Sequence, residues 1–189
     1  MLKVTVSMSV DGFVAGPDVG VDQAMGRRGE ELHEWMFASP RDPVDDEVAA
    51  EMFSPGTVGA VLMGRRTFDV GIGHWGDDGA FGMPCVVVTH RAHEPVAKGA
   101  TTFTFVADGL RSAVERARSA AGDKDVGVMG AELVRQLLID GLIDEIGITL
   151  VPIVLGAGAA LFHDLPPGTV RLEQVGVRPS SSVTHLRYR

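Results

Sequence analysis

Short runs of apolar and β-branched residues alternate along the chain with segments that have helical periodicity. Runs typical of buried strands are found at residues 4–10, 58–63, 86–89, 102–106, 126–129 and 143–151. The i, i+3, i+4, i+7 spacing of an amphipathic helix is present at Leu110, Ala113, Val114 and Ala117. Strands and helices that alternate in this way are typical of an α/β fold with a parallel sheet and crossover helices.

Prolines, glycines and helix caps indicate the other elements. We expect a glycine-rich loop at 16–28, and helices at 30–37, 44–53 and 132–140, with a short one from Arg65. In the helix at 132–140 the leucines 133, 137 and 138 face inward, and Gly141 is the expected C-cap. The segments 170–177 and 183–189 predict a C-terminal antiparallel pair. No repeat or linker interrupts this order, so residues 1–189 are expected to form one domain.

Composition and charge narrow the classes of partner. The chain is 45% hydrophobic and 22% charged, which is typical of a globular protein. Its net charge of −8 argues against a general nucleic-acid-binding protein, because a phosphate backbone needs a basic face. Charged residues, glycine and proline interrupt the most apolar stretch, 143–155, so no membrane association is expected. The single cysteine, Cys85, and the lack of a signal-peptide pattern at Met1 favour the cytoplasm.

A candidate anion site occurs where the strand at 58–63 ends. A glycine, two arginines and a threonine open the next helix there, at Gly64, Arg65, Arg66 and Thr67. The N–H groups and positive end of a helix attract phosphate, the glycine permits close approach, and the arginines add charge-assisted hydrogen bonds. The alternative is a solvated basic turn.

Two further strand ends carry comparable residues. The strand at 126–129 leads through a glycine into a helix, at Met129, Gly130, Ala131 and Glu132. A glycine in that position is often only a helix-start device. The strand at 86–89 ends with a hydroxyl, an imidazole and a guanidinium, those of Thr89, His90 and Arg91. Because ligands of open α/β sheets bind at strand ends, these groups could recognise the phosphate that distinguishes NADPH from NADH. A polar loop is the equal alternative.

Five motifs, in order along the chain, resemble those of one family. They lie at 7–16 (S-x-D-G-x-x-A), 64–67 (G-R-x-T), 88–91, 129–131 (a G-G turn with Met129 at its first position) and 150–162 (P-x-x-L-G-x-G-x-x-L-F). Together they resemble the reductase domain of bacterial bifunctional riboflavin deaminase-reductases, the RibD C-terminal type, which is itself similar to dihydrofolate reductase. Pro84-Cys85 lacks the second cysteine that a zinc deaminase needs, so a stand-alone reductase-like domain is expected.

The resemblance implies a dihydrofolate-reductase-like fold, with a mixed, mostly parallel sheet between helices, and a homodimer. It also implies NADPH as the cofactor, across the C-terminal ends of the strands, with the backbone of Ser7 and Val14 at the nicotinamide carboxamide. The side chains expected around the pyrophosphate and the adenosine phosphate are those of Arg65, Arg66, Thr67, Thr89, His90 and Arg91. The residues expected to cradle the pyrophosphate and the nicotinamide ribose are Gly130, Ala131 and Glu132, and Gly64 and Met129 are two further residues of the expected cofactor site.

Two other motif-like stretches are incomplete. Residues 156–161 imitate the Rossmann G-x-G-x-x-G, but Leu161 replaces the third glycine and too little chain follows for a βαβ unit. His33-Glu34 begins the zinc motif H-E-x-x-H, but Phe37 occupies the place of the second histidine. We therefore expect neither a Rossmann site nor a metal site.

Two carboxylates are candidates for the catalytic chemistry. Glu31 lies near the position where dihydrofolate reductases carry the carboxylate that binds the pterin ring. One helical turn would bring Glu31 and Trp35 to the same face, so that an acid and an aromatic wall meet one heterocycle. The alternatives are a solvated glutamate and a core tryptophan. The second candidate is Asp11, although an aspartate in a D-G turn commonly bonds its own backbone. The residues predicted to line the substrate site are Trp35, Trp75, Val154 and Leu155.

The sequence thus favours an NADPH-dependent reductase that acts on a C=N or C=O group of a small heterocycle, pterin-, pyrimidine- or flavin-like. The cofactor supplies the hydride and the protein supplies orientation and, where needed, a proton. The alternative is a nucleotide- or flavin-binding protein that uses the same cleft with little turnover.

Overall fold

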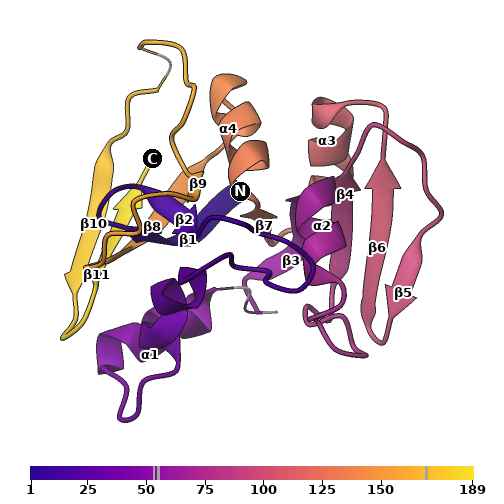
Figure 1. The fold of residues 1–189 in the computed structure, drawn as a ribbon. Coiled ribbons are helices and arrows are strands. Elements are labelled where there is room, and N and C mark those ends of the chain that lie inside the picture. The colour runs from indigo at the N-terminus through magenta and orange to yellow at the C-terminus, as the bar shows by residue number, and fades with distance from the viewer. Residues whose placement is uncertain (53, 55, 169) are drawn as a thin grey trace.

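A nine-stranded sheet forms the centre of the computed structural model, which describes residues 1–52, 54, 56–168 and 170–189 (Figure 1). The strand order is β10-β11-β8-β1-β7-β3-β4-β6-β5. Strands β8 to β6 in this order run parallel, whereas β5 and the β10–β11 hairpin are antiparallel to their neighbours. The strands are β1 (Leu2–Ser9), β3 (Val58–Gly64), β4 (Pro84–Val88), β5 (Val96–Lys98), β6 (Thr101–Val106), β7 (Asp125–Met129), β8 (Glu145–Val151), β10 (Gln174–Pro179) and β11 (Thr184–Tyr188).

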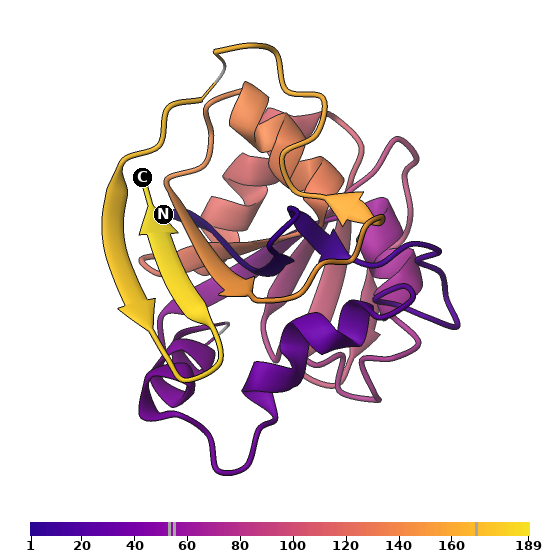
Figure 2. The same cartoon turned by 60° about the vertical axis from the view of Figure 1, so that its left-hand side comes forward.

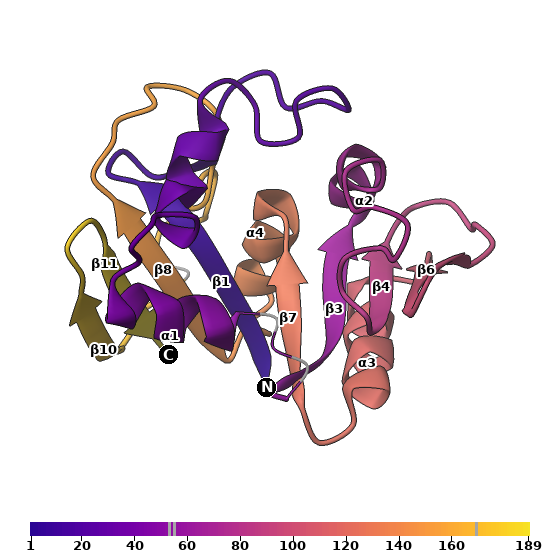
Figure 3. The ribbon, with the colours of Figure 1, turned by 90° about the horizontal axis from the view of Figure 1, so that it is seen from below.

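Helices cover both faces of this sheet. They are the 3-10 helix η1 (Gly29–Met36) and the α-helices α1 (Pro43–Glu51), α2 (Arg65–Gly71), α3 (Leu110–Ala121) and α4 (Ala131–Ile139). Helices α3 and α4 lie on one face; η1, α1 and α2 lie on the other (Figure 3). Among the described residues, no helix combines the length and apolar character that crossing a membrane requires.

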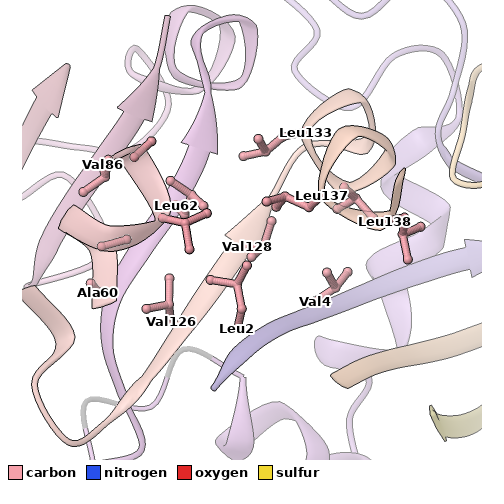
Figure 4. Packing of buried hydrophobic residues seen from close by; sticks show 14 of the residues in the cluster. Leu2, Val4, Ala60, Leu62, Val86, Val126, Val128, Leu133, Leu137 and Leu138 are labelled. Atoms are coloured by element: carbon pink, nitrogen blue, oxygen red, sulfur yellow. The ribbon is translucent and has the colours of Figure 1, made fainter. Parts of the chain in front are cut away.

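The larger core lies between the sheet and helices α3 and α4. Alternate residues of β1, β3 and β7 point into it, as the two-residue period of a strand requires (Figure 4). They meet the helix residues that the sequence pattern predicts to face inward, namely Ala113, Val114, Ala117, Leu133, Leu137 and Leu138. The amphipathic faces of both helices are therefore used as predicted.

The opposite face of the sheet carries two separate apolar clusters. One, beneath α2, is built from β3, β4 and β6 and includes Phe68 and Phe103. The other lies beneath η1 and α1 and contains Leu32, Trp35 and Val48. Figure 3 shows η1 and α1 over the β1–β8 half of the sheet and α2 over the β3–β4 half. The two halves of this face are thus stabilised by different sets of side chains.

The α/β fold, with its mostly parallel sheet, flanking helices and C-terminal antiparallel pair, is confirmed. The predicted helix at 30–37 is corrected in type: it is a 3-10 helix, and its buried residues recur every third position, at Gly29, Leu32 and Trp35. The predicted end of the next helix, Phe53, lies outside the described residues. Asp140 is the C-cap of α4, and Gly141 follows it with φ 62°.

Three short strands were not predicted. They are β5, β2 (Phe13–Ala15) and β9 (Ala159–Ala160), of which the last two pair as a separate small sheet. Each has only two or three residues, too few to show a periodic pattern. The β2–β9 pair joins the motif at 7–16 to the motif at 150–162.

Truncation of Leu137 tests the packing of α4. The side chain is fully buried, so Leu137→Ala leaves a cavity and should lower the free energy of unfolding by about 3 kcal/mol. On the same helix Ile139 is 40% exposed, and Ile139→Ala should cost less than about 1 kcal/mol. Urea denaturation monitored by far-UV circular dichroism measures both, and equal losses would contradict the assigned inner face.

Candidate functional site

The three candidate motifs meet at one edge of the sheet. Strands β7, β3 and β4 are neighbours and parallel, with Met129 beside Met63 and Gly64 beside Val88. Their C-terminal ends therefore lie side by side, and the chain leaves them at Gly130, Gly64 and Thr89 respectively. Residues that are far apart in the sequence are in this way brought to a single strip along the edge of the sheet.

Gly130 permits an unusually close contact between two of these motifs. Its φ is +101°, a conformation that favours glycine, and a β-carbon there would collide with the hydroxyl of Thr67. Neither Gly130 nor Gly64 places a side-chain cap on the helix that follows it. The start of α4 and the first turn of α2 thus meet in one small surface, in which Gly64 and Gly130 are half-buried.

The side chain of Met129 does not obstruct this surface. It packs against the apolar cluster beneath α2, on the face of the sheet rather than at its edge. The replacement of the first glycine of the G-G turn is therefore accommodated in the core. Gly130 alone provides the close approach.

The two arginines of α2 are held differently. Arg65 donates through Nε to Asp69 Oδ1 at 2.7 Å, and its guanidinium lies 5.5 Å from the ring centre of Phe105. Arg66 is exposed and donates to the backbone carbonyl of Val19 at 3.1 Å. Because α2 has only seven residues, these guanidinium groups and not the helix dipole are the main source of positive charge.

The loop at 16–28 reaches across to α2. The hydrogen bond from Arg66 to Val19 is one connection. In the second, Nε2 of His74 lies 2.7 Å from the carbonyl oxygen of Val21. Figure 2 shows this loop extending from β2 to the vicinity of α2. The loop therefore links the half of the molecule that carries η1 to the half that carries α2.

The end of β4 presents two exposed basic side chains. Thr89 is buried, and its Oγ1 accepts a hydrogen bond from the backbone N–H of Arg91 at 3.2 Å. This bond turns the chain at the strand end, with His90 and Arg91 exposed beyond it. Thr89 thus shapes the turn, while the charged group at this end of the site is the guanidinium of Arg91.

Glu132 carries a fixed negative charge in the first turn of α4. Hydrogen bonds from Arg135, at 2.6 and 3.0 Å, and from Gln136 hold its pKa at about 2. The neighbouring Ala131 is half-buried. An ionised carboxylate repels phosphate and accepts hydrogen bonds from hydroxyl groups, so Glu132 suits a sugar better than a phosphate.

The other side of the site contains Ser7 and Val14. Ser7 lies in β1 beneath η1, and Val14 lies in β2. Ser7 is buried, and its Oγ accepts a hydrogen bond from Trp35 Nε1 at 2.9 Å. Val14 packs against the larger core. Strand β1, which carries Ser7, lies next to β7, so these residues are on the side of the strip opposite Thr89.

The expected common face of Glu31 and Trp35 is wrong. In a 3-10 helix, residues three apart align, whereas these two are four apart. Glu31 instead pairs with Arg28 at 2.7 and 3.0 Å, and the hydrogen bond from Arg28 lowers the pKa of the carboxyl. Trp35 is 3% exposed and belongs to the core. Arg28 was missed in the sequence, although its i, i+3 spacing to Glu31 was visible.

Asp11 holds the loop that follows β8. Its carboxylate accepts hydrogen bonds from the backbone N–H groups of Leu155, at 3.1 Å, and Gly156, at 2.7 Å. The hydroxyl of Ser9 and these amides lower the pKa of Asp11. Val154, in the same loop, is 62% exposed. Asp11 therefore fixes the backbone of the loop at Leu155 and Gly156, directly after the predicted substrate residue Val154.

Trp75 belongs to the aromatic group beneath α2. Its ring stacks on Phe103 with centroids 5.7 Å apart and an interplanar angle of 8°. It is half-buried, next to Phe81.

Among the described residues, no group of three or more histidine, cysteine or acidic side chains is arranged to hold a metal ion.

Comparison with known proteins identifies a family. The family model described as the RibD C-terminal domain matches residues 1–186. A Bacillus subtilis protein, YwjB, whose function is uncharacterized, is 27% identical over 188 residues, which cover 97% of this chain and 94% of that protein.

Solved structures agree with this result. A candidate riboflavin biosynthesis protein from Shewanella sp. PV-4 superposes with a TM-score of 0.75 and 26% identity, covering 100% of this chain and 98% of that one. The Thermotoga maritima deaminase/reductase gives 0.64 at 14% identity, with 100% of this chain and 56% of that one covered. Dihydrofolate reductase from Enterococcus faecalis, complexed with NADP(H), gives 0.60 at 16% identity, with 100% and 95% covered. The last two establish the fold alone.

Substitution of Gly130 tests the close approach of the two motifs. Gly130→Ala introduces both an unfavourable φ and a collision with Thr67, and should lower the free energy of unfolding by more than about 3 kcal/mol. Gly109, the N-cap of α3, has a similar φ of +109° but nothing within 4 Å of its β-position, so Gly109→Ala should cost only about 1–3 kcal/mol.

Thr67→Ala combined with Gly130→Ala removes the collision, and should reduce the loss to that of Gly109→Ala. Urea denaturation of these variants and of Thr67→Ala alone measures the coupling between positions 67 and 130. Strictly additive losses would show that the two motifs are not in contact.

The pH dependence of stability tests the role of Asp11. Because its pKa is lowered in the folded state, the carboxylate contributes stability at neutral pH that is lost as the pH falls through that pKa. Asp11→Asn should therefore destabilise the protein at pH 7, and the difference from wild type should narrow below about pH 4. Urea denaturation between pH 3 and pH 7 measures this, with Asp140→Asn as a surface control. A difference that stays constant would exclude the role.

Proposed function

The chain belongs to the RibD C-terminal domain family, and on this premise we propose that it is an NADPH-dependent reductase. The substrate is a small heterocycle, pterin-, pyrimidine- or flavin-like, that is reduced at a C=N or C=O group. One observation carries the proposal: three strand ends that bear glycine, arginine and hydroxyl groups lie side by side along one edge of the sheet.

The residues at this edge fit a dinucleotide. The helices α2 and α4 begin side by side at Gly64 and Gly130, where their backbone N–H groups suit a diphosphate, and the arginines supply the compensating charge. In the proposed arrangement Arg65, Arg66 and Thr67 bind the pyrophosphate beside Gly64 and Gly130. The group beyond Thr89, consisting of His90 and Arg91, binds the adenosine phosphate that distinguishes NADPH from NADH.

The nicotinamide half of the cofactor would lie toward β1. The backbone of Ser7 and Val14 holds the carboxamide, and the start of α4, from Met129 to Glu132, borders the ribose. Because Glu132 is ionised and already neutralised in part by Arg135, it accepts a hydrogen bond from a ribose hydroxyl. The bound nicotinamide supplies the hydride, and the protein sets its orientation.

The substrate would bind between η1 and the loop at 152–156. Glu31 and Asp11 both have lowered pKa values, so at neutral pH they are hydrogen-bond acceptors and not proton donors. Glu31 therefore orients an N–H group of the heterocycle after it exchanges its partner Arg28, and water delivers the proton. Val154 and Leu155 would form a wall of this site, whereas Trp35 is buried in the core behind it and Trp75 lies beneath α2, over the other half of the sheet.

A second function is favoured by the same two carboxylates. Glu31 is engaged by Arg28 and Asp11 by backbone amides, so neither carboxyl group offers an acid. A protein that binds the nucleotide without efficient turnover would have this arrangement. Steady NADPH oxidation with a heterocycle argues for the reductase, whereas tight NADPH binding without oxidation argues for the binding protein. A yellow purified sample would indicate a bound flavin.

We also propose that the protein acts in the cytoplasm as a homodimer, as the family resemblance implies. Multi-angle light scattering of the purified chain distinguishes a dimer near 40 kDa, twice the 20.0 kDa of the chain, from a monomer. The residues at the C-terminal ends of β7, β3 and β4 that we assign to the nucleotide all belong to one chain. Their assignment is therefore independent of the oligomeric state.

Arginine substitutions test the cofactor site. Arg65→Ala, Arg66→Ala and Arg91→Ala should each weaken NADPH binding by about 10- to 100-fold, because each removes a charge-assisted hydrogen bond to phosphate. Arg91→Ala should leave NADH binding unchanged and so abolish the preference for NADPH. Isothermal titration calorimetry measures the affinities, and a thermal-shift screen with NADPH, NADH, FMN and pterins gives the ligand range.

Arg118→Ala is the matched control for these variants. Arg118 pairs with Asp144 at 3.4 Å, at the end of the sheet where β8 begins, and should not contact the cofactor. NADPH affinity that stays unchanged in all three test variants would refute the assignment of the strip.

A further inference from the structure

A row of polar side chains is buried beneath η1 and α1. Ser7, Thr149 and His185 come from the adjacent strands β1, β8 and β11, where Ser7 is in register with Thr149 and Thr149 with His185. Their exposed fractions are 2%, 2% and 6%. Three strands thus present hydrogen-bonding groups to a region from which solvent is excluded.

His185 lies at the centre of a chain of hydrogen bonds. Its Nε2 is 2.7 Å from Oδ1 of Asp45 on α1, and its Nδ1 is 2.9 Å from Oγ1 of Thr149. Since a carboxylate can only accept, Nε2–H donates to Asp45, and in the neutral imidazole the Thr149 hydroxyl donates to Nδ1. The arrangement of acid, imidazole and hydroxyl is that of a hydrolase triad. Because Thr149 is 2% exposed, no substrate reaches the hydroxyl and this chemistry is excluded.

The same imidazole contacts Trp35. The two rings meet edge to face, with centroids 5.1 Å apart and an interplanar angle of 67°. On its other side, the indole donates through Nε1 to Ser7 Oγ at 2.9 Å. Trp35 is therefore located by a strand at each side, β1 through Ser7 and β11 through His185.

Helix α1 is tied to the C-terminal hairpin at further points. Asp42, its N-cap, accepts a hydrogen bond from the backbone N–H of Ser181 at 3.0 Å. Arg178 pairs with Glu51 at 3.1 Å, on the exposed side of the helix. Asp45 is the buried member of this set, with 1% exposure. The position of α1 on the sheet is thus determined by specific polar contacts in addition to the apolar cluster beneath it.

Such a network is a poor source of stability. Removing a carboxylate and an imidazole from water costs free energy that their mutual hydrogen bond only offsets, and apolar residues of similar volume commonly stabilise as well or better. What hydrogen bonds add is a defined geometry, since each donor must meet its acceptor. The physical effect of the row is therefore to fix orientation, and the side chain so oriented is Trp35.

We propose that His185 is a positioning residue for the substrate side of the site. With Asp45 and Thr149 it fixes the plane of Trp35, and through Trp35 it fixes η1 relative to Ser7 of β1. The inference rests on the proposed function in one respect, that η1 borders the substrate while the cofactor occupies the strip at β7, β3 and β4. It predicts that changes at His185 affect the substrate and not NADPH.

Four variants separate orientation from stability. His185→Leu leaves Asp45 buried without its partner and should lower the melting temperature by about 10 °C. Asp45→Leu combined with His185→Leu removes the unpaired charge and should recover most of that loss. Asp45→Asn keeps an acceptor for Nε2–H and should preserve the wild-type position of Trp35. Asp46→Leu, at an exposed neighbour with 58% side-chain exposure, is the control.

The near-UV circular dichroism and acrylamide quenching of Trp35 provide the direct measurement. The chain has two tryptophans, so Trp75→Phe leaves Trp35 as the sole tryptophan signal. We expect the double variant to be stable but to have an altered Trp35 spectrum, while Asp45→Asn and Asp46→Leu keep the wild-type spectrum. A stable double variant with the wild-type spectrum would show that the network is only structural and would overturn the proposal.

The second experiment measures the steady-state kinetics of the same variants without the Trp75→Phe substitution. With the heterocycle that supports NADPH oxidation by the wild type, kcat/KM of the double variant should fall at least about tenfold. Its Kd for NADPH should stay within about twofold of wild type. A parallel loss of NADPH affinity would overturn the proposal. Should the wild type bind no NADPH, the reductase assignment fails while the Trp35 spectra still decide the role of His185.

Discussion

The close contact between the ends of two parallel strands is the constraint on which the site depends. Strands β3 and β7 pair directly, and the helices that follow them begin at the same edge, with no room for a β-carbon at Gly130 beside Thr67. A parallel pair has this effect because both chains leave the sheet in the same direction. The residues that we assign to the pyrophosphate, Arg65, Arg66 and Thr67, lie in the first turn of α2, directly beside this contact.

The two faces of the sheet make different contributions. The face covered by α3 and α4 is a continuous apolar core, which holds the strands in register. On the other face the apolar side chains divide into two clusters, one for η1 and α1 and one for α2. Polar residues such as Ser7 and Thr149 are buried next to the first cluster, where they orient the layer above. The site thus combines a rigid support with two helical regions that are anchored separately.

Much of the fold was predictable from the sequence, because long periodic segments specify their own type. The alternating strands and the inward leucines of α4 are examples. The 3-10 geometry of η1 was not predictable, since Gly29, Leu32 and Trp35 fit a helical spacing of either kind over one or two turns. The partners of charged side chains were also hidden. Arg28 pairs locally with Glu31, but Asp45 meets His185 across 140 residues, and no local pattern reports such a contact. The ends of β3 and β7 were found because glycine followed by a helix start is a local signal, and the parallel order of the sheet places the end of β4 beside them.

The position of β1 also has a consequence for how the chain acquires its structure. Its neighbours in the sheet are β7 and β8, so that Leu2 pairs with Val126 and Ser9 with Val151. Each residue of β1 that pairs with β8 lies 142 positions from its partner in the sequence. Such distant partners give the topology a high contact order, and folding of the central layer is expected to be slow. Until these partners have formed, the apolar residues of β1 are exposed, and the partly folded chain is prone to aggregation.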